Sequence, residues 1–207
     1  MMRTPDYWPR ATRELAARDA VMRDLIDRFQ GLALGSRGDA FSTLARSIVG
    51  QQISVKAAQS VWDRLATRLG TVTPVSIHRA HRSRLRACGL SAQKAGYLKD
   101  LAGRFRNGTL EPARWHALDD ERVIAELTSV KGIGRWTAEM FLIFYLTRPD
   151  VFPLADLGLH RAMRIHYNRG RVLSQQRMRG IGALWAPWRS VATWYLWRSL
   201  DPIPVEY

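Results

Sequence analysis

Residues 130–138 read VKGIGRWTA, and the two glycines, Gly132 and Gly134, lie between two segments of helical spacing. Glycine accepts positive φ and lets another backbone approach closely, so an apolar-Gly-Ile-Gly string allows a very tight turn between helices. The amides of such a turn, and of the helix that follows it, would point outward and could hold a phosphate. A bare Gly-x-Gly between helices also fits an ordinary helix corner. The rest of the chain must therefore decide between the two interpretations.

The chain on either side of this stretch contains helix start and stop signals and no sustained two-residue alternation, which predicts an all-α fold. We expect helices from about 41 and over about 14–29, 54–69, 73–89, 91–107, 119–129 and 136–146. A loop over 148–155 then leads to Asp156, which opens a further helix. The last two helices are expected from about 174 and over about 187–200.

The composition indicates a protein that buries an apolar core and attracts polyanions. Hydrophobic residues make up 46% of the chain and charged residues 24%, which is typical of globular proteins. Lys and Arg total 32 against 18 Asp and Glu, so the net charge is +14. Such a surface suits nucleic-acid phosphates, although an arginine-rich host proteome would also produce it. At 207 residues, we expect one functional unit.

Several classes of site and location are excluded by the sequence. Cys88 is the single cysteine, so intramolecular disulfides, four-cysteine iron–sulfur clusters and cysteine-based zinc sites cannot form. The five histidines suggest no metal site, and we expect no cofactor. No apolar signal core and no run of membrane-spanning length occurs. We therefore expect an intracellular protein with no membrane partner.

The motifs resemble those of a known enzyme superfamily. Residues 130–138 resemble the helix-hairpin-helix element of DNA glycosylases, and the loop that ends at Asp156 resembles the catalytic loop of the same superfamily. Residues 48–58 (IVGQQISVKAA) and 186–190 (APWRS) resemble the alkyladenine branch, the DNA-3-methyladenine glycosylases of bacteria and fungi. The similarity spans about 41–200 and is to compact members that lack an N-terminal sheet lobe. A second string, Arg179-Gly180-Ile181-Gly182, lies inside an expected helix and is interpreted as coincidence.

The resemblance implies two helical lobes flanking a DNA-binding cleft, with the helix-hairpin-helix motif at about 119–147. The central lobe would cover about 50–135, and the second lobe would combine about 1–49 with about 136–207. The expected partner is double-stranded damaged DNA, and we expect a monomer in the bacterial cytoplasm that is associated with the nucleoid through DNA. The implied activity is hydrolytic excision of alkylated purines such as 3-methyladenine and 7-methylguanine, which leaves an abasic site.

The catalytic residue implied by the resemblance is Asp156. Its carboxylate would stabilise the oxocarbenium-like sugar that forms when the glycosidic bond breaks. An aspartate before a helix is also an ordinary N-cap, and both roles are compatible. Trp136 occupies the place where bifunctional relatives carry a Schiff-base lysine, so strand cleavage is not expected.

The remaining site residues follow from the same resemblance. Cationic alkylated bases favour tryptophan walls, and the base pocket is assigned to Trp136, Met140 and Trp197, whereas Trp62, Trp115 and Trp185 are expected in the core. DNA-backbone binding is assigned to the hairpin residues Lys131, Gly132, Ile133, Gly134, Arg135 and Thr137. Gln52 and Ile53, at the break between two helices, are candidates for the wedge that fills the gap left by a flipped base. They could equally be buried polar groups of a helix break.

Two alternatives stay open. The first is a glycosylase for another lesion on the same fold, because lesion choice depends on pocket details. The second is a noncatalytic helix-hairpin-helix module, which the carboxylate at Asp156 disfavours because binding alone gains nothing from negative charge near phosphate. A zinc deaminase is disfavoured because its Cys-x-x-Cys ligands are missing.

Overall fold

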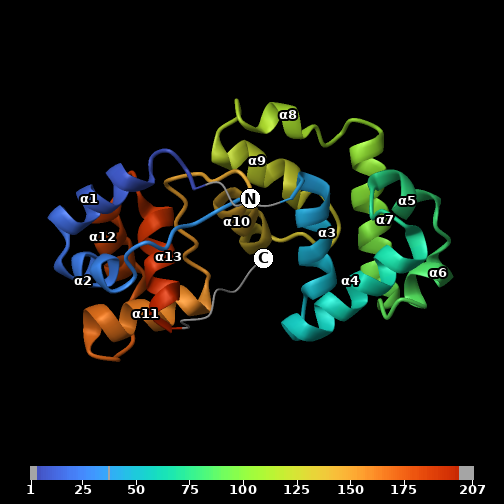
Figure 1. Ribbon diagram of the computed structural model, residues 1–207. Coiled ribbons are helices and arrows are strands. Elements are labelled where there is room, and N and C mark those ends of the chain that lie inside the picture. Colours follow the sequence, from blue (N-terminus) through green and yellow to red (C-terminus); the bar gives the residue numbers. More distant parts are fainter. Residues whose placement is uncertain (1–3, 37, 201–207) are drawn as a thin grey trace. The chain divides into compact units, whose positions relative to one another are not determined.

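The structure is a computed structural model that describes residues 4–36 and 38–200. In this part of the chain the regular elements are thirteen α-helices without strands, which confirms the all-α prediction (Figure 1). None of the described helices is long and apolar enough to cross a membrane.

The chain divides into two compact units. The terminal unit contains the described residues 4–36 and 142–200, and the central unit contains residues 38–141. The division falls inside α10 (Arg135–Phe144), which contributes to both units. The lobe bounds given above for a DNA cleft stay a prediction.

The terminal unit is built around its last helix. Residues 190–196 of α13 are all buried, so this part of the helix has no solvent-facing side. Figure 1 shows α13 among the other helices of the unit, and it packs on α11, α2, α1 and α12. The helices of the unit are α1 (Trp8–Arg18), α2 (Ala20–Arg28), the end of α10, α11 (Leu157–Asn168), α12 (Gln175–Trp185) and α13 (Arg189–Leu200).

The central unit is organised around α7 (Ala92–Arg106), which packs on α3, α5 and α6. Its buried residues Ala95, Leu98, Leu101 and Ala102 recur at three- and four-residue spacing, which places one apolar stripe of the helix in the core. The other helices of the unit are α3 (Ala40–Gly50), α4 (Val55–Leu69), α5 (Pro74–Arg79), α6 (Arg82–Arg86), α8 (Pro112–Trp115), α9 (Asp120–Thr128) and the start of α10.

The single helix expected over 14–29 is wrong, because the structure has α1 and α2 with a break at Asp19. The Asp19 carboxylate caps α2 by accepting from the amides of Val21 and Met22. It also accepts from Trp185 Nε1 at 2.9 Å and from the Tyr167 hydroxyl at 2.8 Å. These donors satisfy a buried carboxylate and therefore fix the chain break at this residue.

The single helix expected over 73–89 is also wrong, because α5 ends at Arg79 and α6 begins at Arg82. His81 caps α6 and interrupts the helical hydrogen bonding. The short helix α8 was not predicted. The helix starts expected near 54, 91 and 156 are confirmed, and Ser54, Ser91 and Asp156 cap these helices, since each side chain accepts an amide of its helix's first turn.

Candidate active site and nucleic-acid interface

The hairpin between α9 and α10 requires a glycine at position 132. Gly132 has φ +86°, and a Cβ added there would overlap the ring of Tyr97 on α7. Gly134 meets neither restriction, because it has open space around it and no positive φ. Ile133 is 4% exposed, so its side chain is buried. The first glycine of the motif therefore serves both the turn and the close approach of α7.

The polar backbone groups of the hairpin are partly used inside the protein. The Lys131 amide donates to Asp100 Oδ2 at 2.9 Å, so it is not the outward-pointing donor that the sequence suggested. The Gly132 carbonyl accepts from Gln51 Nε2 at 2.7 Å. The amides of Gly132 and Gly134 have no acceptor among the described residues. They, with the first amides of α10, are the groups left for a phosphate.

The charged side chains of the hairpin differ in their surroundings. Lys131 is exposed. The Arg135 guanidinium donates to Glu121 through Nη1 at 2.9 Å and to Glu139 through Nε at 3.1 Å, and these carboxylates raise its pKa above the ordinary value. Thr137 is buried in the first turn of α10. Lys131 is thus the available cation, whereas Arg135 joins α9 to α10.

The break between α3 and α4, residues 51–54, forms a turn that we call the wedge turn. Gln52 has φ +58° and an exposed side chain, and Ile53 is 41% exposed. Gln51 is turned the other way, toward the Gly132 carbonyl. The structure therefore brings the wedge turn and the hairpin together in the central unit.

Asp156 lies at the N-terminus of α11 in the terminal unit. Its carboxylate oxygen Oδ1 accepts from the Leu159 amide at 2.6 Å and from Trp197 Nε1 at 2.8 Å. The residue is 9% exposed, although the next side chain, Leu157, is 83% exposed. A nearly buried carboxylate with neutral donors and the positive end of a helix dipole is suited to face a developing positive charge.

The loop before Asp156 is held by α13 and α11. The Val151 amide donates to Ser190 Oγ at 2.9 Å, and the Ser190 amide donates to the Pro149 carbonyl at 3.0 Å. His160 Nε2 is 2.6 Å from the Leu154 carbonyl. These contacts hold the loop against both helices and so fix the backbone that leads to Asp156.

The second glycine string lies inside α12, as expected. The structure adds a packing reason for its last glycine, because a Cβ at Gly182 would lie 2.6 Å from the ring of Phe152. Phe152 belongs to the loop before Asp156, so Gly182 lets α12 support that loop.

Asp150 lies in the same loop and is fixed by a contact with α13. Its carboxylate forms a two-pronged ion pair with Arg189, with Nε at 2.7 Å and Nη2 at 2.8 Å. Arg189 begins α13, so the pair attaches the loop to that helix. Planar guanidinium and carboxylate groups favour this geometry.

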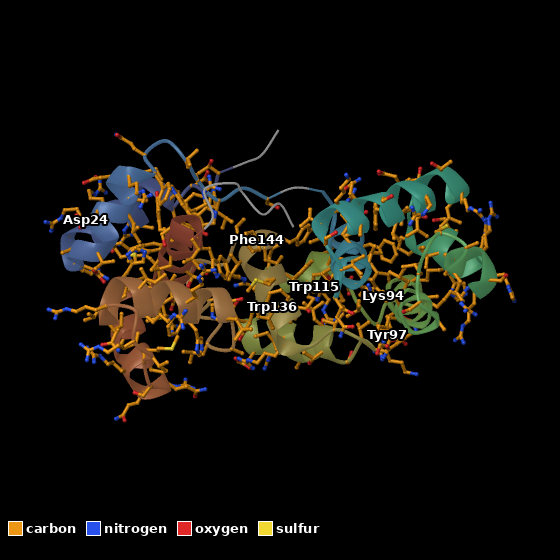
Figure 2. All side chains as sticks on the ribbon, turned by 90° about the horizontal axis from the view of Figure 1, so that it is seen from below. Asp24, Lys94, Tyr97, Trp115, Trp136 and Phe144 are labelled. Carbon is orange, nitrogen blue, oxygen red and sulfur yellow. The ribbon has the colours of Figure 1, made fainter. Side chains whose placement is uncertain are left out.

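The aromatic residues assigned from the sequence fall into two groups. Trp62, Trp115 and Trp185 are buried, which confirms the core prediction. Trp197 stacks on Phe144 with centroids 5.8 Å apart and an interplanar angle of 16°. Trp136 and Phe144 lie near opposite ends of α10 (Figure 2), and Trp136 is 39% exposed whereas Met140 is buried.

The site carries no recognisable metal centre in the described residues, where no group of three or more His, Cys, Asp or Glu side chains could hold an ion.

The sequence profile of the HhH-GPD superfamily of base excision DNA repair proteins matches residues 45–187. The chain belongs to this superfamily. Both the glycine hairpin and Asp156 fall inside the matched segment.

Known HhH-GPD relatives share sequence and fold with this chain. DNA-3-methyladenine glycosylase 1 of Schizosaccharomyces pombe is 34% identical over 78% of this chain and 72% of its own. The crystal structure of DNA-3-methyladenine glycosidase from Bacillus halodurans has a TM-score of 0.88 and 31% identity, covering 97% of this chain and 93% of that one. S. pombe Mag1 in complex with abasic DNA has a TM-score of 0.77 and 30% identity, covering 96% and 98%.

Some neighbours of the motif residues in this HhH-GPD chain were missed by sequence reasoning. Tyr97 packs on Gly132, Glu121 pairs with Arg135, and Phe144 stacks on Trp197. Their signals are weak, because each is an ordinary helical residue whose role depends on a partner distant in the chain. Phe144 alone had a hint, since it lies in the same apolar helix as the assigned Trp136 and Met140.

Proposed function

We propose that this protein is a monofunctional DNA glycosylase that flips alkylated purines such as 3-methyladenine and 7-methylguanine out of duplex DNA and hydrolyses the glycosidic bond. The product is an abasic site. The names of the relatives and the membership in a base excision repair superfamily support this activity. The substrate is double-stranded damaged DNA. The protein acts as a monomer in the cytoplasm, on the DNA of the nucleoid.

The observation that carries the proposal is the environment of Asp156. Its carboxylate is nearly buried and accepts hydrogen bonds from an indole N–H and a helix amide. Breaking a glycosidic bond gives the sugar oxocarbenium character, and a preorganised carboxylate stabilises that charge. The Leu159 amide meets the capping role, and the Trp197 indole adds a donor from α13 that orients the carboxylate.

The leaving group explains why one carboxylate suffices. A purine alkylated at N3 or N7 carries positive charge in the ring, so it departs as a neutral base without a strong general acid. Trp136, Met140 and Trp197 are the side chains we assign to the base pocket. Aromatic faces attract such cationic rings by about 0.5–2 kcal/mol.

The absence of strand cleavage follows from Trp136. Bifunctional enzymes need an amine that attacks the sugar and forms a Schiff base. An indole cannot perform this step, so water is the nucleophile and the DNA strand stays intact. Asp156 would orient that water as well as stabilise the sugar cation.

DNA binding is assigned to the hairpin residues 131–135 and 137 and to the net charge of +14. Backbone amides and Lys131 would hold phosphates without reading sequence. The wedge turn, Gln52 with Ile53, would fill the gap left by the flipped base, which lowers the cost of unstacking.

The experiment is a panel of duplexes that each contain one lesion: 3-methyladenine, 7-methylguanine, an oxidised purine or a mismatch. Released bases are identified, and strand integrity is examined before and after alkali treatment. We expect alkylpurine release, with strands intact until alkali is added. Release of the oxidised or mismatched base alone, or a covalent adduct trapped by borohydride, would contradict the proposal.

A further inference from the structure

Lys94 joins α7 to the end of α3. Its ammonium nitrogen Nζ donates to the Val49 carbonyl at 2.8 Å and to the Gln51 carbonyl at 2.6 Å. The last carbonyls of a helix have no partner within the helix and lie at the negative end of its dipole. Lys94 therefore occupies the position where a cation serves as the C-terminal cap of α3, immediately before the wedge turn.

The contact with Gln51 controls the backbone of Gln52. The Gln51 carbonyl and the Gln52 amide belong to one planar peptide unit, so fixing the carbonyl fixes the plane about which φ of Gln52 turns. That φ is +58°, a left-handed value. A non-glycine residue held in a sparsely populated region costs of order 1–3 kcal/mol and needs support from its surroundings. The ammonium of Lys94 supplies that support.

The same turn is also tied to the hairpin. Gln51 Nε2 donates to the Gly132 carbonyl at 2.7 Å, while Tyr97 packs on Gly132 from the same helix that carries Lys94. Lys94 and Tyr97 both extend from α7 (Figure 2). The helix α7 thus positions the phosphate-binding hairpin and the wedge turn together.

Lys94 is half-buried, and burial lowers the pKa of its ammonium below the ordinary value because desolvation disfavours the charged form. What distinguishes Lys94 is its pair of carbonyl contacts beside Gln52, not this shift.

We propose that Lys94 is a positioning residue, which holds the wedge turn in the conformation that presents Gln52 and Ile53 to DNA. This proposal rests on the proposed function only in the experiment that measures base excision. Loss of the ammonium would free the Gln51–Gln52 peptide to rotate, and the wedge side chains would lose their common direction.

The same helix offers a matched control. Lys99, also on α7, donates through Nζ to the carbonyls of Ile77, His78 and Ala80 at the end of α5. Burial lowers its pKa as well. Lys99→Met therefore removes a capping ammonium of the same kind, away from the wedge turn and the hairpin.

The first measurement is amide hydrogen exchange in the free protein, which needs no substrate. The Ile53 amide donates to the Gly50 carbonyl at 3.3 Å across the turn. Lys94→Met should accelerate exchange at Ile53 and leave Ala80 unchanged, and Lys99→Met should do the reverse. Lys94→Arg, which keeps a cation, should restore protection at Ile53. Wild-type exchange at Ile53 in Lys94→Met would overturn the proposal.

The second measurement is a double-mutant cycle on single-turnover excision. Lys94→Met alone should lower the rate roughly 10- to 100-fold, because misplacement of a group by about 1 Å has effects of this size. In a Gln52→Ala/Ile53→Ala background the same change should have little further effect. If Lys94→Met lowers the rate by the same factor in both backgrounds, Lys94 does not act through Gln52 and Ile53, and the proposal is overturned. A wild-type protein without alkylpurine excision would refute the proposed function only, and the exchange data would still decide on Lys94.

Discussion

Trp197 donates a hydrogen bond from its indole nitrogen Nε1 to Oδ1 of Asp156, over 2.8 Å. The indole is itself fixed, because its ring stacks on Phe144 at 5.8 Å. The carboxylate therefore has one donor on α11, the Leu159 amide, and one donor on α13. Trp197 orients the carboxylate in addition to the pocket role assigned from the sequence.

Replacing Trp197 by phenylalanine tests this relationship. Trp197→Phe keeps an aromatic ring for the stack on Phe144 but removes the N–H. A hydrogen bond to a charged group contributes about 1.5–3 kcal/mol, so single-turnover excision should fall about 10- to 100-fold. Trp194→Phe, on the same helix and in contact with Trp8, is the control and should keep the wild-type rate. An unchanged rate in Trp197→Phe would mean that the helix amide alone orients the carboxylate.

The two hairpin glycines should respond differently to a methyl group. Gly132→Ala combines a strained φ with overlap on the Tyr97 ring, and overpacking of this kind destabilises by about 1–3 kcal/mol. Gly134→Ala has open space and no positive φ, so its unfolding temperature should stay near wild type. Thermal unfolding and duplex binding are the measurements. Equal losses in both variants would exclude the Tyr97 contact as the cause.

Salt dependence of DNA binding separates the two basic residues of the hairpin. Lys131 is exposed, so Lys131→Ala should reduce the slope of log affinity against log salt by about one. Arg135 is engaged by Glu121 and Glu139, so Arg135→Ala should change the slope less and lower thermal stability more. Titration of undamaged duplex at several salt concentrations checks both. The reverse order would show that Arg135 leaves its carboxylates to bind phosphate.

The stability of the protein should fall below neutral pH in part because of His166. Burial, and then the nearby charge of Arg28, lower the pKa of this imidazole. The unfolded chain binds the proton more readily, so the contribution is present above the ordinary histidine value of about 6.5 and is lost as the pH falls toward the folded pKa. His166→Gln should flatten the decline in unfolding free energy between pH 7 and pH 5. Parallel curves for the two proteins would exclude the role.

The fold was predictable where its signals are local. Ser54, Ser91 and Asp156 each cap a helix within three residues of their own position, so the sequence indicates these helix starts. The break at Asp19 was not predictable in the same way. Its partners, Tyr167 and Trp185, lie 148 and 166 residues away, and only the folded unit brings them together.

The candidate site divides along the same line. The glycine hairpin and the loop that ends at Asp156 can be recognised from a single sequence, because their residues lie close together along the chain. The groups that orient them, Tyr97 and Phe144, are ordinary helical side chains, and packing gives them their roles. The charge of Arg135 suggested a phosphate contact from the sequence, but the structure shows that its guanidinium is paired with Glu121.

The last prediction concerns the carboxylate itself. Asp156→Asn keeps a carbonyl oxygen that can still accept from Leu159 and Trp197, so α11 should remain capped and folded. It removes the negative charge opposite the sugar cation. Removing one preorganised electrostatic contact slows reactions by roughly 10²- to 10³-fold, and we expect at least this loss with DNA binding retained.

The matched control is Asp39→Asn, because Asp39 caps α3 through the same kind of bond, to the Ser42 amide at 2.9 Å, and belongs to the central unit. It should excise 3-methyladenine at the wild-type rate. Asp150→Asn is a second comparison, since loss of the Arg189 ion pair should lower stability while the folded fraction still excises the base. If Asp156→Asn were active and Asp150→Asn inactive at equal folded fraction, the catalytic charge would belong to Asp150, although membership in the superfamily would stand.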